Sequence, residues 1–196
     1  MRAPVSFTMA SLNPPEPKLS DGVITLRPFT PADVPVVTLA CQDPELSRWT
    51  AQVPWPYTEN DAIEWISRHR AMWSEGRGAP FAIVDQNGQL LGAISLNPVD
   101  WSSLEAGVGY WVAHWARKGG VATRALELVV IWAFQALGLT TLKLETMLGN
   151  VASERVAAKA GFQMVGVQKG WPHPIVPDMA FDVKHWVKPF GMTAAR

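Results

Sequence analysis

Hydrophobic and polar residues alternate with two periods along the chain, and the two periods predict a mixture of strands and helices. Residues 23–29 and 141–147 alternate with period two, which is typical of half-buried strands. Residues 121–137 form a long apolar stretch without glycine or proline, which predicts a long helix. Residues 31–41 and 58–73 repeat their apolar positions at helical spacing. The pattern therefore favours a sheet covered by helices.

Capping and turn signals divide the rest of the chain. Thr30–Asp33 has threonine as N-cap, proline at the first helical position and an acid in the first turn, so it begins a helix. Thr58–Asp61 resembles a capping box. Asn87-Gly88 predicts a hairpin between strands at 81–84 and 89–97. The remaining predicted elements are a short helix at 44–48, a strand at 104–113, a helix at 151–160, and strands starting at 162 and covering 179–186.

The predicted order is β-α-α-β-β-β-α-β-α-β-β, which fits a mixed α/β (α+β) domain with helices on both faces of one sheet. We expect this domain to span residues 22–188. Residues 1–21 contain four prolines and little periodicity, which predicts a flexible proline-rich tail. Residues 189–196 are predicted to form a C-terminal tail.

The composition argues against several classes of function. Seventeen basic and seventeen acidic residues give a net charge of zero, whereas nucleic-acid binders usually show a basic excess. The single cysteine, Cys41, excludes a disulfide framework, and the four histidines show no metal-ligand spacing. No apolar run approaches membrane-spanning length. We therefore expect a cytoplasmic protein without a metal, a nucleic-acid partner or a membrane partner.

Residues 107–123 carry the chemistry on which the functional interpretation depends. A strand containing Gly107 and Gly109 leads into the turn Arg117–Ala122, and the long helix follows. A glycine turn at a helix start leaves backbone N–H groups unpaired, and these groups and the helix dipole both favour an anion. Arg117 and Lys118 add positive charge. The expected ligand group is a phosphate, although the turn matches neither a P-loop nor a dinucleotide fingerprint.

Arg117-x-x-Gly120-x-Ala122 at the start of a long helix resembles the acyl-CoA pyrophosphate loop of the GNAT N-acetyltransferases. Asn150-x-x-Ser153, followed by the segment 158–162, resembles the second CoA-contacting segment of that family. Gly109–Trp111, Leu26–Pro28 and Trp55–Tyr57 make the chain similar to the RimJ/RimL branch. That branch acetylates protein N-terminal amines, and many of its relatives acetylate small amines.

The resemblance implies a GNAT fold, in which a mostly antiparallel mixed sheet is splayed at its middle, with acetyl-CoA as cosubstrate and no metal. The pantetheine arm would lie between the strands at 104–113 and 141–147, like an added strand. The residues expected to contact acetyl-CoA are Trp111, Val112, Arg117, Lys118, Gly119, Gly120, Val121, Ala122, Thr123, Asn150, Ser153 and Lys159. The acyl carbonyl would point at a backbone N–H near Val112.

The implied reaction is direct attack of a neutral amine on the thioester. Ser153 matches the position that serves the leaving thiolate in RimL-like enzymes, although it also fits as a first-turn residue of its helix. Many relatives carry a glutamate where this chain has Gly107, so we predict that Glu105, on the same strand face, acts as the base through water. His173, Asp178 and His114 are alternative bases.

The acceptor side is predicted to be aromatic. Its expected residues are Trp49, Trp55, Tyr57, Trp171 and His173. Forming the neutral amine at pH 7 costs about 1 kcal/mol for an α-amine and about 4.6 kcal/mol for a lysine side chain. A site without a well-placed base therefore favours a peptide N-terminus or a small-molecule amine. A non-catalytic acyl-CoA sensor and a transferase with another acyl donor are the alternatives, and a homodimer is possible.

Overall fold

One eight-stranded sheet organises the protein, with strand order β1-β2-β3-β4-β5-β6-β8-β7. The computed structural model describes residues 12–16, 18–176 and 178–191. Within these residues every neighbouring strand pair is antiparallel except β5 and β6, which are parallel. The strands are β1 (Leu19–Ser20), β2 (Ile24–Arg27), β3 (Ala79–Asp85), β4 (Leu90–Asp100), β5 (Glu105–Val112), β6 (Thr141–Met147), β7 (Gln163–Pro172) and β8 (Ala180–Pro189). The mixed sheet predicted from the sequence is confirmed.

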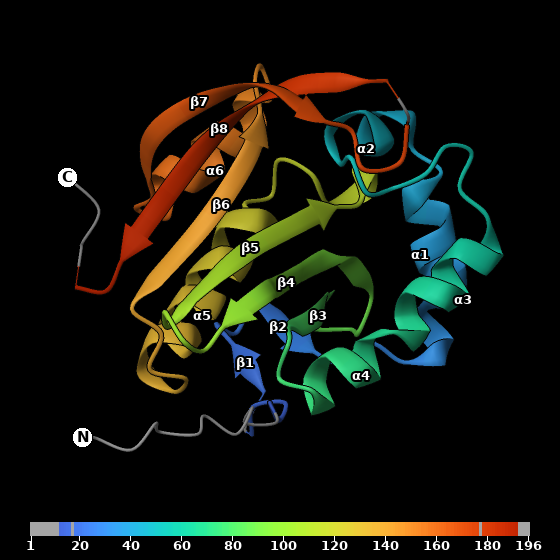
Figure 1. Ribbon diagram of the computed structural model, residues 1–196. Coiled ribbons are helices and arrows are strands. Elements are labelled where there is room, and N and C mark those ends of the chain that lie inside the picture. The colour runs from blue at the N-terminus through green and yellow to red at the C-terminus, as the bar shows by residue number, and fades with distance from the viewer. Residues whose placement is uncertain (1–11, 17, 177, 192–196) are drawn as a thin grey trace.

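Helices cover both faces of the sheet (Figure 1). The helical segments are η1 (Pro31–Asp33), α1 (Val34–Cys41), α2 (Pro44–Trp49), α3 (Glu59–Ser67), α4 (His69–Ser74), η2 (His114–Ala116), α5 (Val121–Gln135) and α6 (Val151–Lys159). Helices α5 and α6 pack on one face, and α1 and α3 on the other. Among the described residues, no helix is long and apolar enough to cross a membrane.

Strand alternation divides the apolar residues between two cores. On β5, Ala106 and Val108 belong to the core with α5, whereas Trp111 belongs to the core with α1 and α3. On β6, Leu142 and Leu144 are buried against α5 and α6, while the residues between them face away. Successive side chains of a strand point to opposite faces, so the face of any β5 or β6 residue follows from its position.

The predicted helix start at Thr30 is confirmed, and it is joined to the sheet by a buried ion pair. The Asp33 carboxylate, only 6% exposed, accepts hydrogen bonds from the Thr30 N–H at 2.8 Å and from two Arg27 nitrogens at 2.7 and 2.8 Å. Burial alone would raise the pKa of Asp33, but the hydrogen bonds from Arg27 and Thr30 outweigh it and lower that pKa. This pair connects β2 to the first helical turn.

Two stretches differ from the predicted elements. The helix expected over 58–73 is divided, because α3 ends at Ser67 and α4 begins at His69. The loop predicted at 171–177 begins two residues later, because Trp171 and Pro172 still pair with β8. Apart from these changes, the long helix, the hairpin and β6 lie where the pattern placed them.

The predicted N-terminal tail includes residues that the structure places on the domain. Leu12 is buried, and its N–H donates to the Trp73 carbonyl at 2.9 Å. Leu19 and Ser20 form β1 and pair with β2. The described fold therefore begins before the predicted boundary at residue 22, and at the other end β8 extends through Pro189. Residues 1–11 and 192–196 of the two predicted tails lie outside the described residues.

We predict that Asp33→Asn lowers the free energy of unfolding by about 3 kcal/mol, because the Arg27 charge then stays partly buried without its partner. The pKa of Asp33 is lowered in the folded state, so the stabilisation is complete at neutral pH and is lost as the pH falls through the folded pKa. Denaturant unfolding at pH 7 and at lower pH measures both effects. The exposed capping residue Asp61 is the control, since Asp61→Asn should cost only about 1 kcal/mol. Equal losses in the two variants would contradict a role for burial.

Candidate functional site

The β5–β6 ladder stops halfway along the two strands. Glu105 through Val108 pair with Thr141 through Leu144, and no pairing between these strands continues beyond that point. Strand β5 goes on pairing with β4 as far as Val112, while β6 goes on pairing with β8 as far as Met147. The two strands therefore separate toward their C-terminal ends (Figure 1). We call this opening the fork, formed by residues 109–112 of β5 and 145–147 of β6.

The fork exposes backbone amides of β5. The Ala113 N–H donates to the Leu91 carbonyl on β4. Because successive amides of a strand point to opposite edges, the N–H groups of Val112 and Tyr110 point away from β4, toward the fork. A Cβ built on Gly109 would meet nothing within 4 Å, so the face of the sheet is also open beside this edge. This edge can therefore hydrogen-bond an extended, amide-containing ligand as an added strand would.

A cradle of backbone N–H groups lies where β5 leads into α5. Lys118 and Gly120 both have positive φ, of 65° and 76°, and Gly120 is the N-cap of α5. Glycine has no side chain to cap the helix, so the first-turn N–H groups of Val121, Ala122 and Thr123 remain available. The helix dipole adds partial positive charge at the same place. This geometry suits a phosphate or pyrophosphate.

Arg117 lies beside this cradle but is directed to other partners. Its guanidinium forms an ion pair with Asp43, which precedes α2, and its Nε donates to the Val112 carbonyl at 3.3 Å. The arginine thus connects the end of β5 to α2. The sequence predicted that Arg117 would add positive charge next to the phosphate. It gave no sign of the partner Asp43, which is 74 residues away in the chain.

Helix α6 begins beside the fork and brings Ser153 to β5. The Asn150 side chain caps this helix by accepting from the Ser153 N–H at 3.1 Å, so the predicted N-cap is confirmed. The Ser153 hydroxyl lies 2.8 Å from the hydroxyl of Tyr110 on β5. Burial raises the pKa of Tyr110 to about 12, so this phenol keeps its proton at neutral pH. Tyr110 can therefore donate to the serine oxygen, which leaves the serine proton for another acceptor.

The comparisons with known proteins agree with this geometry. The model of the GNAT acetyltransferase domain matches residues 24–163. The chain belongs to the GNAT acetyltransferase family. An uncharacterized N-acetyltransferase of Bacillus subtilis (strain 168), YoaA, is 28% identical over 80% of this chain and 92% of its own length. The ribosomal-protein-serine acetyltransferase of Escherichia coli (strain K12) is 24% identical over 69% of this chain and 75% of its own length.

A solved structure extends the likeness to the RimJ/RimL branch. The Mycobacterium smegmatis RimJ structure, determined with a CoA disulfide, is 26% identical and superposes with a TM-score of 0.77 over 86% of this chain and 83% of its own. The protein is an acetyl-CoA-dependent acyltransferase of the GNAT family, and the resemblance found in the sequence is confirmed. The fork and the cradle of N–H groups fit the amide-rich arm and the pyrophosphate of CoA. Among the described residues, no cluster of three or more potential ligands could hold a metal ion.

Within this GNAT domain, Glu105 does not lie at the fork. It is the first residue of β5, and its carboxylate forms an ion pair with Lys143 on β6. It lies four positions before Gly109, and four positions along a strand span about 13 Å. A role for Glu105 as the base stays a prediction, and this ion pair with Lys143 would have to open for the carboxylate to reach the fork. The alternative bases stay predictions: His173 Nδ1 accepts hydrogen bonds from the N–H groups of Ile175 and Val176, and Asp178 and His114 are exposed.

The absence of a glutamate at Gly107 has a steric cause. A Cβ at this position would lie 2.6 Å from the Asn97 carbonyl oxygen, which belongs to the backbone of β4. The β4–β5 register shifts between Leu96 and Val99, which brings the two backbones together here. A side chain at position 107 would therefore force the backbone of β4 to shift.

A carboxylate that sequence reasoning missed lies at the fork itself. Glu145 is the first residue of β6 after its last pairing with β5, and it faces away from α5 and α6. Its carboxylate lies 3.5 Å from Nδ1 of His185, the residue directly opposite on β8. The Trp171 ring lies 5.7 Å from that imidazole. The only sequence signal was the alternation of β6, which put Glu145 on the polar face without indicating its partner.

The predicted aromatic wall is only partly assembled. Trp49, at the end of α2, lies beside Gly149, in the turn after β6, so it approaches the far side of the fork. Trp171 lies near His185, and Trp55 is 56% exposed. Tyr57 is buried in the core with α1 and α3, and its hydroxyl interacts with Cys41. The structure therefore removes Tyr57 from the cleft that the sequence predicted.

Lys159 lies at the C-terminal end of α6 and is exposed. It is six residues beyond Ser153, about 9 Å along the helix axis, so it is not at the fork. A contact between Lys159 and CoA stays a prediction. By contrast, Trp111 and Val112 lie on the fork strand, and residues 117–123 form the cradle.

We predict that Gly120→Ala and Gly119→Ala have different effects. At Gly120 a side chain must adopt φ near 76°, which should cost about 1–2 kcal/mol of unfolding free energy and weaken acetyl-CoA binding by turning the first-turn N–H groups. Gly119 is the control: its φ lies outside the left-handed region and a Cβ would meet its nearest atom at 3.7 Å, so Gly119→Ala should stay within about 0.5 kcal/mol of wild type. Thermal unfolding and calorimetric titration with acetyl-CoA measure both effects. Equal stability losses in the two variants would count against the backbone argument.

Proposed function

We propose that the protein transfers the acetyl group of acetyl-CoA to a primary amine, by direct attack of the neutral amine on the thioester. The acceptor is a peptide α-amine or a small-molecule amine. The observation that carries this proposal is the position of the fork. It lies between the N–H cradle of α5, which suits the CoA pyrophosphate, and the Glu145–His185 pair on the open face.

On the donor side, the pantetheine arm lies along the free edge of β5. The thioester carbonyl then receives a hydrogen bond from a fork-facing N–H, that of Val112 or Tyr110. One such donor is typically worth about 3–4 kcal/mol when negative charge develops on the oxygen. Holding the thioester and the amine in one opening supplies further rate through proximity.

The leaving thiolate is stabilised by the Ser153 hydroxyl. The two hydroxyls lie 2.8 Å apart, and when Tyr110 is the donor the serine proton is left to point toward the sulfur. Asn150 fixes the serine backbone through the helix cap. Serine is thus both a first-turn residue of α6 and the group that serves the leaving thiolate, and these two roles are compatible.

The base is Glu145, acting directly or through one water, with His185 as its partner. It directly follows Leu144, the last β6 residue paired with β5, and it lies on the face that α5 and α6 leave open. The imidazole orients the carboxylate and can pass the amine proton to solvent. Glu105, whose carboxylate is bound to Lys143, is the competing candidate.

The acceptor amine enters beside Trp49, which lies near Gly149 after β6, and Trp171, which lies near His185 on β8. Aromatic walls accommodate an apolar or planar group next to the amine. The Escherichia coli relative is named for ribosomal-protein serine, which supports a peptide N-terminus as one acceptor class. The easier deprotonation of α-amines supports the same choice.

We predict that a peptide with a free α-amine is acetylated roughly 100-fold more efficiently at pH 7 than the same peptide with a blocked N-terminus and one lysine. The measurement is thiol release from acetyl-CoA over N-terminal peptides, amino acids, polyamines, aminoglycosides and aromatic amines, with mass spectrometry of each product. Turnover on no amine, with acetyl-CoA still bound, would contradict the proposed transfer. Equal turnover on the lysine side chain would contradict the acceptor class.

We predict that Glu145→Gln lowers kcat/KM for the amine about 100-fold and leaves acetyl-CoA affinity unchanged. The matched control is Glu105→Gln, the same substitution at the other end of the paired segment, which should keep kcat/KM within about twofold of wild type. Steady-state kinetics on the best amine and calorimetric titration with acetyl-CoA separate the two effects. A large loss in Glu105→Gln with full activity in Glu145→Gln would reverse the assignment.

A further inference from the structure

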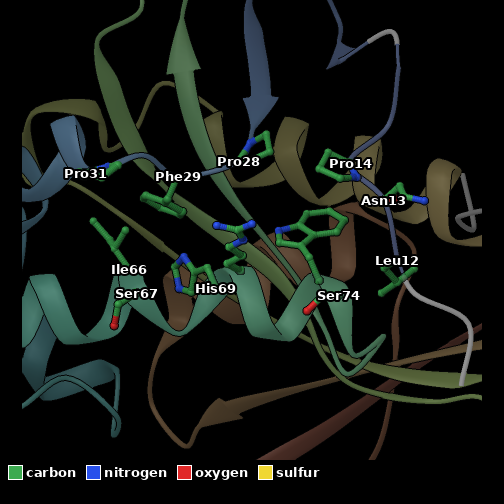
Figure 2. Close-up of a pocket in the computed structure, with 12 residues that line it drawn as sticks. Leu12, Asn13, Pro14, Pro28, Phe29, Pro31, Ile66, Ser67, His69 and Ser74 are labelled. Carbon is green, nitrogen blue, oxygen red and sulfur yellow. The ribbon is translucent and has the colours of Figure 1, made fainter.

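The helices between β2 and β3 reach different parts of the molecule. Helices α3 and α4 line a cavity of about 580 Å³, together with residues 12–14 and the loop 28–31 (Figure 2). None of the described residues that line this cavity belongs to α2, the fork or the N–H cradle. Helix α2 instead lies beside the C-terminal end of β5, where the fork opens (Figure 1). The contacts of α2 therefore bear on the fork.

The first end of α2 is fixed to the β5 side of the fork. Asp43 is the N-cap of α2, and one of its oxygens accepts a hydrogen bond from the Glu45 N–H at 3.0 Å. Its other oxygen accepts from the Arg117 guanidinium at 2.5 Å, and Arg117 Nε donates to the carbonyl of Val112, the last residue of β5. The Asp43 side chain is only 15% exposed, so the ion pair is partly shielded from water and salt.

The other end of α2 contacts the β6 side of the fork. Trp49 is the last residue of α2, and Cη2 of its indole lies 4.0 Å from a Cβ built on Gly149, in the turn after β6. Trp49 Nε1 donates to the Glu45 carboxylate at 3.2 Å, which orients the ring on its own helix. Between the two ends, Leu46 is buried in the core that includes Trp111 of β5. Helix α2 therefore bridges the C-terminal ends of β5 and β6, across the open end of the fork.

We propose that Asp43 is a positioning residue for the acceptor amine, and that it acts by holding Arg117 and so fixing α2 across the fork. The inference rests on the proposed acceptor side beside Trp49. Without the charge of Asp43, α2 is released from the end of β5 and Trp49 shifts relative to the amine. The N–H cradle at the start of α5 does not involve Asp43, so it keeps its shape. Asp43 therefore contributes to amine binding and not to acetyl-CoA binding.

The test is steady-state kinetics at saturating acetyl-CoA, with a short peptide that has a free N-terminal serine. Asp43→Asn keeps a capping oxygen and removes the charge, so KM for the peptide should rise about fivefold, with kcat within about twofold of wild type. Acetyl-CoA affinity, measured by calorimetric titration, should stay within about twofold. An unchanged KM for the peptide, or a fivefold loss of acetyl-CoA affinity, overturns the proposal.

The matched control is Asp21→Asn. It breaks another partly exposed Asp–Arg pair, formed with Arg124 and not involving α2. KM for the peptide should then stay within about twofold of wild type. An equal rise in KM in Asp21→Asn and Asp43→Asn would overturn the proposal, because the effect would then be one of charge alone.

A double-mutant cycle shows whether Asp43 acts through Arg117. Arg117→Gln alone should also raise KM for the peptide about fivefold, and the double variant should show no further rise, because both changes break the same pair. Thermal unfolding confirms that each variant is folded. Effects that multiply, to roughly 25-fold in the double variant, would mean that the two residues act independently, and they would overturn the proposal.

Two further measurements separate this inference from the proposed function. If Trp49→Ala leaves KM for the peptide unchanged, the proposed acceptor side is wrong and the inference falls with it. If Trp49→Ala raises KM and Asp43→Asn does not, only the inference falls. Hydrogen exchange of residues 46–49 needs no amine, and it should be faster in Asp43→Asn and Arg117→Gln than in wild type or Asp21→Asn. Equal exchange in all these proteins overturns the proposed role of the pair, even if no amine is acetylated.

Discussion

The site depends on one constraint, the point at which the β5–β6 ladder ends. Parallel strands that stay paired satisfy each other's backbone groups and leave nothing for a ligand. Here the pairing stops after Val108 and Leu144, so the remaining amides of β5 face an opening. Each strand still has its other neighbour, β4 or β8, to keep it straight. The fork is therefore a gap between two strands that are each paired on their other edge, and a CoA arm can replace the missing strand contacts.

The two faces of the sheet divide the chemistry. The face covered by α5 and α6 supplies the helix starts: the N–H cradle after Gly120 and the Asn150 cap that holds Ser153. The opposite face, beyond the reach of α1 and α3, carries Glu145 and His185. In the proposed mechanism, the carboxylate on one face would serve the attacking amine as a base, and the hydroxyl on the other face would serve the leaving group as an acid.

Some buried polar groups of the described residues have hydrogen-bond partners, and others have none. The Asp33 carboxylate has partners for its oxygens, and the arrangement holds β2 to the first helical turn. His69 and Trp73 are buried just as deeply, yet each leaves one nitrogen without a partner among the described residues. Unsatisfied groups of this kind typically cost about 1–3 kcal/mol each. Asp33 therefore stabilises the fold through its partners, whereas His69 and Trp73 each carry this cost.

The sequence by itself determined the features that arise from neighbouring residues. The Thr30 and Thr58 capping boxes, the Asn87-Gly88 hairpin and the Asn150 cap are interactions within a few residues, so their residue types predict them. The glycine turn at 117–122 was predicted for the same reason, because the φ values it needs are a local property of glycine. The family resemblance rests on the glycine turn and on the Asn150–Ser153 segment, together with three short motifs at 26–28, 55–57 and 109–111.

Only the tertiary structure decided which distant residues meet. Gly107 faces the Asn97 carbonyl because of the β4–β5 register, Arg117 meets Asp43 from another helix, and Tyr57 turns into a core. Glu145 and His185 are brought together by a strand pairing across 40 residues, whereas Glu105, favoured by its position on β5, is bound to Lys143 instead. Periodicity gives the face on which a side chain lies, but not the residue opposite, because register and the end of a ladder are set by the packing of the whole sheet.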